Sequence, residues 1–185
     1  VYCEASIENI GIEDRLARSS GAAWFTKAIA LRDDTKIDWV YFQDETVTFR
    51  FEYKIQRPVR DLAVLFRLIL AADPVGGRPE TIVTEIFEVL SSEQVSAGAS
   101  AIVLRLPELK LRPNEFSVYV WLGRTDRSAA YDTLDTHVSL PRLVIKSRTP
   151  SALPLRGLVP VDYEIRNLDL ENLAPATLVE SKDLP

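Results

Sequence analysis

The chain has 185 residues, 46% of them hydrophobic and 26% charged. This length and composition suit one globular domain with a buried core. The formal net charge of −5 argues against a nucleic-acid partner, because neutralising phosphates requires clustered Lys and Arg. No apolar run approaches the roughly 20 residues that a membrane-spanning helix needs. The single cysteine, Cys3, excludes an intrachain disulfide.

Strands are predicted wherever Val, Ile, Phe and Tyr alternate with polar residues between turn-forming clusters. The clearest case is 47–55, where one face is apolar and the other is polar. At this spacing, about eight or nine strands predict an all-β antiparallel sandwich or barrel. In chain order the predicted strands are Tyr2–Ile10, Trp24–Leu31, Glu45–Ile55, Leu62–Ala71, Thr81–Leu90, Ala99–Leu106, Glu115–Gly123, Leu134–Ile145 and Leu158–Ile165.

The domain organisation follows from where this alternation stops. Residues 1–166 are expected to form the β-sandwich, and residues 167–185, which have no clear period, a C-terminal tail or docking segment. The chain begins with Val1 and contains no Met. We therefore expect a fragment of a longer protein, with removal of the initiator as the alternative.

A search for catalytic and cofactor motifs is negative. The sequence has neither the G-x-x-x-x-G-K-[ST] loop nor the G-x-G-x-x-G turn of nucleotide sites. It has one Cys and one His, His137, with no spacing typical of a zinc site. No G-x-S-x-G elbow accompanies His137, and a lone strand histidine is more often a surface or structural residue. We expect no enzyme activity, metal or cofactor.

Carboxylates near strand ends have two interpretations. Asp132 and Asp135 flank a predicted strand entry, where Asp commonly makes turn hydrogen bonds. A pair of carboxylates could also serve a glycoside hydrolase if the two groups were held at a set separation. The turn or ligand-binding interpretation is favoured, because the sequence shows no such pairing.

Residues 116–122 (FSVYVWL) are the most suggestive of binding. Phe116, Val118 and the next alternate residues form an apolar core face, which leaves Ser117, Tyr119 and Trp121 on the opposite face. Aromatic rings with polar atoms suit sugar recognition; the alternatives are that a neighbouring segment or a second subunit covers them, or that both faces of the strand are buried. In the predicted strand Leu62–Ala71, Arg67 needs an acidic or ligand partner if buried, and a cross-strand pair with Glu85 of the next predicted strand is the simplest one.

Several of these segments resemble a known pattern. Residues 104–123 (LRLPELKLRPNEFSVYVWLG) resemble the strand–turn–strand motif of the C-terminal domain of Wzt-type ATP-binding subunits of polysaccharide ABC transporters. The following segment 131–135 (YDTLD) is similar to the Asp-containing loop of that family, and 143–145 to its closing strand. The likeness extends over roughly residues 1–165. Asn114 stands where the family usually has Gly.

The resemblance implies an immunoglobulin-like antiparallel sandwich of about eight strands. It further implies a cytoplasmic, homodimeric module that recognises O-antigen polysaccharide at the inner face of the inner membrane. An ATPase domain would precede it, and a membrane subunit of the transporter would be a partner. The alternative is a structural, dimerisation or protein-interaction domain that binds no glycan. The candidate glycan-binding residues are Tyr119, Trp121, Ser117, Arg67, Tyr131, Asp132 and His137.

Overall fold

The computed structural model describes residues 21–72, 79–107, 111, 113–136, 139–148 and 164–170. These residues form strands, turns and loops, and no helix occurs among them. The predicted all-β sandwich is confirmed. The strands are β1 (Ala23–Arg32), β2 (Thr35–Ile37), β3 (Val40–Phe42), β4 (Val47–Ile55), β5 (Leu62–Leu70), β6 (Thr81–Ser91), β7 (Gly98–Leu106), β8 (Asn114–Arg124), β9 (Ala130–Asp135), β10 (Leu143–Lys146) and β11 (Glu164–Asp169). Across the described ranges, no helix is long and apolar enough to cross a membrane.

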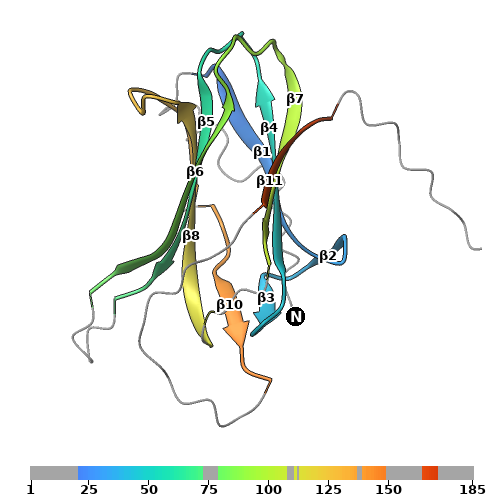
Figure 1. The fold of residues 1–185 in the computed structure, drawn as a ribbon, viewed down its shortest axis with the longest axis vertical. Coiled ribbons are helices and arrows are strands. Elements are labelled where there is room, and N and C mark those ends of the chain that lie inside the picture. Colours follow the sequence, from blue (N-terminus) through green and yellow to red (C-terminus); the bar gives the residue numbers. More distant parts are fainter. Residues whose placement is uncertain are drawn as a thin grey trace, which may run out of the picture.

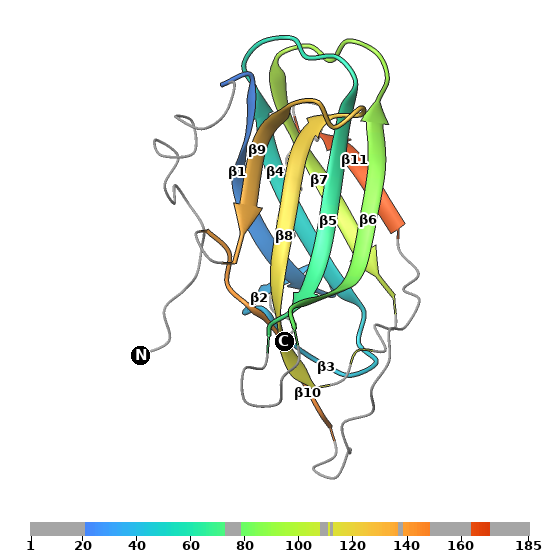
Figure 2. The same ribbon diagram turned by 90° about the vertical axis from the view of Figure 1, so that its left-hand side faces the viewer.

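Two sheets face each other in the sandwich (Figure 1). Sheet A has the order β11-β7-β4-β1-β2, and sheet B the order β3-β10-β8-β5-β6, with β9 also paired to β8. Figure 2 shows sheet B in front and sheet A behind it. The strand pairs are antiparallel except for β3 with β10, which is parallel. This pair departs from the fully antiparallel sandwich that the sequence predicted.

Period-2 alternation places one face of each central strand between the sheets. In β4, Val47, Phe49, Phe51, Tyr53 and Ile55 are all buried, as predicted. Strands with this pattern bury alternate side chains because successive Cβ atoms point to opposite faces.

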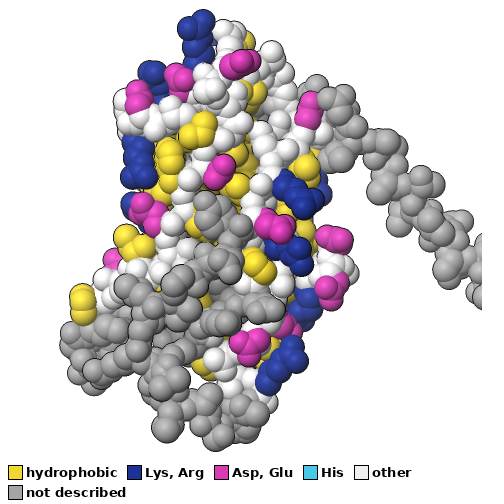
Figure 3. All heavy atoms as spheres, viewed as in Figure 1, with side chains coloured by type: hydrophobic (Ala, Val, Ile, Leu, Met, Phe, Trp, Pro, Cys, Tyr) yellow, Lys and Arg dark blue, Asp and Glu magenta, His cyan; other side chains and the backbone are white. Residues whose placement is uncertain are grey.

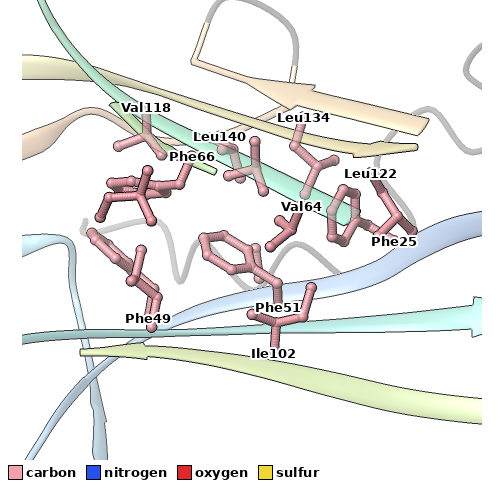
Figure 4. Packing of buried hydrophobic residues seen from close by; sticks show 14 of the residues in the cluster. Phe25, Phe49, Phe51, Val64, Phe66, Ile102, Val118, Leu122, Leu134 and Leu140 are labelled. Carbon is pink, nitrogen blue, oxygen red and sulfur yellow. The ribbon is translucent and has the colours of Figure 1, made fainter. Parts of the chain in front are cut away.

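Aromatic side chains from both sheets meet at the centre of the sandwich (Figure 4). The ring centroid of Phe66 on β5 lies 5.6 Å from that of Phe49 and 6.4 Å from that of Phe51, both on β4. Phe25 on β1 meets Phe51 edge-on at 6.1 Å. At such separations aromatic pairs attract each other beyond the area they bury, so these rings join the two layers.

The sandwich edge formed by β6 and β11, the last strands of the two sheets, faces the viewer in Figures 1 and 3. Hydrophobic side chains reach the surface there, with charged side chains on either side of them (Figure 3). Ile82 and Val89 of β6 are among the exposed large hydrophobic residues, at 45% and 47%.

Tyr41 on β3 fastens one end of sheet B to sheet A. Its hydroxyl lies 2.9 Å from the carbonyl oxygen of Leu31 on β1 and 3.1 Å from that of Thr48 on β4. Burial raises the pKa of Tyr41 to about 12, because the ionised phenolate would lose its hydration. The side chain therefore stays a neutral hydrogen-bonding group.

The prediction of one continuous strand at Leu134–Ile145 was wrong. The segment is divided into β9 and β10 by a turn, because the backbone amides of Ser139 and Leu140 both donate to the carbonyl of Asp135 at 2.9 and 2.8 Å. Pro141 follows and has no amide hydrogen to add to a ladder. The two short strands then pair separately with β8.

The predicted set also missed β2 and β3. Asp33 and Asp34 both have positive φ, 48° and 62°, which is the conformation of a two-residue type I′ hairpin turn. This turn brings β2 beside β1, with Arg32 opposite Thr35. Strands of three residues are too short to show a clear alternation, so tertiary pairing alone defines them.

Of the first and last predicted strands, only part of the last lies among the described residues. The expected strand Tyr2–Ile10 lies outside the described residues. Near the other end, β11 pairs with β7 over its whole length, from Glu164 opposite Arg105 to Asp169 opposite Ser100. The predicted boundary at residue 166 therefore falls inside a strand, and the predicted strand Leu158–Ile165 is described only from Glu164 onward. Residues 171–185, the rest of the expected tail, lie outside the described part.

Candidate functional site: the outer face of sheet B

The outer face of sheet B carries a cluster of apolar side chains, although it faces away from the core. Ala63, Leu65 and Trp121 form a buried cluster of their own, against which Phe87 and Tyr119 pack. We call these five residues the aromatic face. They come from β5, β6 and β8, and they lie on the side of sheet B opposite the sandwich core.

The strand register arranges the site in two rows. Leu65 lies between Phe87 on β6 and Trp121 on β8. Two residues further along β5, on the same face, Arg67 lies between Glu85 on β6 and Tyr119 on β8. Side chains directly opposite each other on one sheet face are close enough to interact. A hydrophobic row therefore runs beside a polar and aromatic row.

The two predicted aromatic residues differ in their access to solvent. Tyr119 is half-buried, whereas Trp121 is 9% exposed. The Trp121 ring lies over the backbone of Gly123, since a Cβ at that glycine would be 2.1 Å from Cζ2 of the indole. The indole therefore lies along the strand, and Trp121 forms the floor of the aromatic face.

Charged side chains border the aromatic face. The predicted pair of Arg67 and Glu85 is confirmed, with 2.7 Å between Nε and Oε2. The Arg67 guanidinium also lies 5.6 Å from the ring centre of Tyr119. Arg127, in the β8–β9 turn, lies 4.5 Å from the ring centre of Phe87 and 3.8 Å from the carboxylate of Glu85. The Glu85 carboxylate thus pairs with the guanidinium groups of Arg67 and Arg127, and each guanidinium lies beside an aromatic ring.

Sequence reasoning did not identify Arg127 or Phe87 as site residues. Arg127 has a positive φ of 58° and reaches β6 from a turn, a contact between residues far apart in the sequence. Phe87 lies in a predicted strand, and its place opposite Leu65 depends on the register of β6 against β5. Alternation alone could have placed Phe87 and Glu85 on the same face of β6, because they are two residues apart.

Four of the predicted site residues come together and two do not. Ser117, which is 6% exposed, lies on the same side of β8 as Tyr119 and Trp121 and is paired with Ile69 of β5. Arg67 completes this group. His137 lies outside the described residues.

Tyr131 and Asp132 are interior residues. A register shift in the β8–β9 pair places Asp132 opposite Leu122 and Ala130 opposite Gly123, so Tyr131 is the extra residue of a bulge. Both neighbours can therefore be buried, with 8% and 4% exposure. Oδ2 of Asp132 accepts a hydrogen bond of 2.8 Å from the backbone amide of Phe25 on β1. Asp132 thus links the two sheets, on the opposite side of sheet B from the aromatic face.

The groups on the aromatic face suit non-covalent recognition. Half-buried rings offer apolar surfaces, and the flanking guanidinium and carboxylate groups offer hydrogen bonds. In the part of the chain that the structure describes, no group of three or more His, Cys, Asp or Glu residues could hold a metal ion.

Replacing Gly123 with alanine is expected to disrupt the aromatic face. The new methyl group would lie 2.4 Å from Cη2 of Trp121 and 2.5 Å from the backbone oxygen of Ala129. The ring and the β8–β9 turn must both shift, and such overpacking costs about 1–3 kcal/mol. The measurement is the free energy of unfolding in urea, together with the indole resonance of Trp121.

The combined substitution Gly123→Ala with Trp121→Phe provides the control. Phenylalanine lacks the two indole atoms that the new methyl group meets, so the double variant should lose less stability than the sum of the two single variants. Strict additivity would show that the indole ring does not lie over Gly123.

Comparisons with known proteins find a structural likeness but no related sequence. No family model matches the chain, and no curated protein matches it. Among solved structures, one described as the crystal structure of the C-terminal domain of Wzt aligns with 84% of this chain and 84% of its own. The TM-score is 0.49 and the sequence identity is 12%.

Proposed function

We propose that this β-sandwich recognises a bacterial surface polysaccharide, of the O-antigen type, without chemically altering it. The observation that carries the proposal is the aromatic face: a hydrophobic row of Phe87, Leu65 and Trp121 beside the row of Glu85, Arg67 and Tyr119. The sequence resemblance to the Wzt-type domain supports the choice of ligand class, and the all-β fold is compatible with it.

In this proposal the residues of the site have separate roles. Tyr119 and Phe87, both half-buried, present ring surfaces against which the C–H faces of a sugar ring can stack. Arg67, Glu85 and Arg127 supply donors and acceptors for its hydroxyl groups. Trp121 supports these side chains from below, because only 9% of it is exposed. This differs from the sequence interpretation, in which Trp121 contacts the ligand directly.

The cellular context is part of the same proposal. We place the module in the cytoplasm at the inner face of the inner membrane, as the non-enzymatic recognition part of an ABC transporter for polysaccharide. An ATPase domain in the same protein, a membrane subunit and a second copy of this chain would be its partners. The resemblance in residues 104–123 supports this context.

The direct test is titration of isotope-labelled protein with O-polysaccharide from the source strain, followed by NMR. Resonances of Tyr119, Phe87 and the Trp121 indole should shift at repeat-unit concentrations on the order of millimolar or below. Tyr119→Ala and Phe87→Ala should each weaken binding by about 0.5–1.5 kcal/mol, or roughly two- to twelvefold.

Trp24→Ala is the matched control, because Trp24 is a half-buried aromatic residue of β1 that belongs neither to the aromatic face nor to the residues lining the charged hollow described below. Its affinity for the glycan should stay unchanged. An absence of shifts at saturating glycan would overturn the proposed function. If glycan caused the same shifts in the Tyr119→Ala and Phe87→Ala variants, the glycan would bind at a different site.

A structural or dimerisation role is the second candidate. The low exposure of Trp121 and the exposed Ile82 and Val89 on β6 are also compatible with a sheet face that another protein subunit covers. Light scattering at micromolar concentration distinguishes the two: a dimer that dissociates on Tyr119→Ala or Val89→Glu substitution would place the subunit interface on this face. A dimer that tolerates both substitutions would leave the face open to glycan.

A further inference from the structure

A charged hollow lies on the outer face of sheet A, on the opposite side of the sandwich from the aromatic face. It has a volume of about 610 Å³ and is lined by residues of β1, β4, β7 and β11, of the β1–β2 turn, and of the segments before β4 and after β10. Its four basic residues are Arg32, Arg105, Arg148 and Arg166, and we call it the arginine hollow. Figure 3 shows Lys or Arg and Asp or Glu side chains intermingled on the side of the molecule where β11 lies.

The register of sheet A brings these residues together. Arg105 on β7 lies between Thr48 on β4 and Glu164 on β11. One pair further along, Arg166 of β11 lies opposite Val103. Residues separated by more than fifty positions in the sequence thus line one side of a single concave surface.

Two of the four acidic side chains of the hollow, Glu45 and Glu164, have cationic or backbone partners, and the other two, Asp33 and Asp34, lie exposed in the β1–β2 turn. Glu45, 17% exposed at its side chain, accepts hydrogen bonds from the amide of Phe42 at 2.9 Å, from Arg32 at 2.8 Å and from Arg148 at 3.1 Å. Burial would raise the pKa of this carboxyl, but these donors outweigh it and lower the pKa. One oxygen of Glu164 lies 3.9 Å from Nη1 of Arg105 and 3.7 Å from Nη2 of Arg166.

The basic side chains have donors in excess of these acceptors. A guanidinium has five N–H donors, and the side chains of Arg105, Arg148 and Arg166 are 53%, 67% and 74% exposed. The distances from Arg105 and Arg166 to Glu164 are longer than a hydrogen bond. Exposed ion pairs of this kind contribute little to stability, so a stronger acceptor can take the place of Glu164 at low cost.

We infer that the arginine hollow binds an anionic group, a carboxylate or phosphate, carried by a saccharide. Planar guanidinium groups match such oxyanions, to which they donate two hydrogen bonds at once. A divalent cation fits less well, because Glu45 and Glu164 already face arginine side chains and, among the described residues, no group of three or more His, Cys, Asp or Glu could hold a metal ion. The volume is that of a small-ligand site. The saccharide part of this inference rests on the proposed function; the anion part does not.

The test uses three probes of one protein at constant ionic strength: inorganic phosphate, glucuronate and glucose. Phosphate and glucuronate should shift the side-chain Nε–H resonances of Arg105 and Arg166 and the backbone amide of Val103, and glucose should not. In the double variant Arg105→Gln with Arg166→Gln, affinity for both anions should fall at least tenfold.

Arg142→Gln is the control, because it makes one such substitution in an exposed ion pair, with Glu115 at 3.0 Å, on the side of sheet B. Anion affinity should be unchanged in this variant. Equal shifts with glucose, or unchanged phosphate affinity in the double variant, would overturn the inference. Binding of phosphate without glucuronate would overturn the carboxylate part of the inference.

The two proposals fail separately. Tyr119→Ala should leave phosphate binding at the arginine hollow intact, because the two sites lie on opposite outer faces of the sandwich. Loss of glycan binding at the aromatic face while the hollow still binds anions overturns the proposed function alone. Glycan binding at the aromatic face without anion binding at the hollow overturns the anion site alone.

Discussion

Replacing Phe51 with alanine is expected to lower the free energy of unfolding by about 3–5 kcal/mol, the range for removing a large aromatic side chain from a core. Phe51 is 1% exposed, and its ring contacts Phe25, Phe49 and Phe66 at centroid distances of 6.1, 5.9 and 6.4 Å. The loss combines the transfer free energy of the ring with the cavity left between two sheets that cannot close on it. Urea unfolding followed by fluorescence measures it.

Phe42→Ala serves as the control for this experiment, since it removes the same atoms from a side chain that is 37% exposed. Its expected cost is below about 1 kcal/mol, as for most exposed positions. Similar losses for the two variants would contradict the arrangement in Figure 4, in which Phe51 lies between the sheets.

The second large effect is expected from Asp132→Ala, at about 3 kcal/mol. The buried carboxylate of Asp132 accepts hydrogen bonds from the backbone amides of Phe25 and Thr133, both at 2.8 Å. Hydrogen bonds to a charged group contribute about 1.5–3 kcal/mol, and a buried donor left without an acceptor adds its own desolvation cost. Urea unfolding gives the total, and hydrogen exchange of the Phe25 amide reports the bond between the sheets.

Asp132→Asn separates the hydrogen bonds from the volume of the side chain. Asparagine has a similar shape but only one carbonyl oxygen, so it can keep one of the two bonds and should lose about half as much stability. Faster exchange of the Phe25 amide in Asp132→Ala than in Asp132→Asn would agree with this. If neither variant changed the exchange of that amide, Asp132 would not join the sheets.

The two outer faces of the sandwich differ in character, and this difference organises both proposals. Sheet B presents the aromatic face, with Leu65, Phe87 and Tyr119 beside one ion-paired cluster. Sheet A presents the arginine hollow, bordered by Arg105 and Arg166. Both surfaces depend on a shared core, because burying one side of each strand directs the alternate residues outward.

Alternation in the sequence was sufficient to predict the layers. The apolar positions of 47–55 and 116–122 repeat every second residue, and a strand with that period can only bury one face. The same rule placed Ser117, Tyr119 and Trp121 on the outer side of β8, where the structure has them. It also indicated the partnership of Arg67 and Glu85, because adjacent antiparallel strands bring such residues opposite each other.

Local patterns failed where a single residue changed the register or ended a strand. Tyr131 and Asp132 were taken as ligand-binding candidates, yet the bulge at Tyr131 turns both toward the interior. The fold of Ser139 and Leu140 back onto Asp135 divides what appeared to be one strand. In each case the deciding contact is made by backbone groups, which carry no sequence signature.

The sequence by itself therefore determined the class of fold, the core positions and the outward orientation of Tyr119 and Trp121, because each follows from the period-2 geometry of one strand. Only the tertiary structure decided how far those side chains reach solvent and which residues join them. Gly123 beneath the indole, Arg127 beside Phe87, and the convergence of Arg105 and Arg166 all depend on the register between strands. Register is fixed by pairing and packing across the whole sheet.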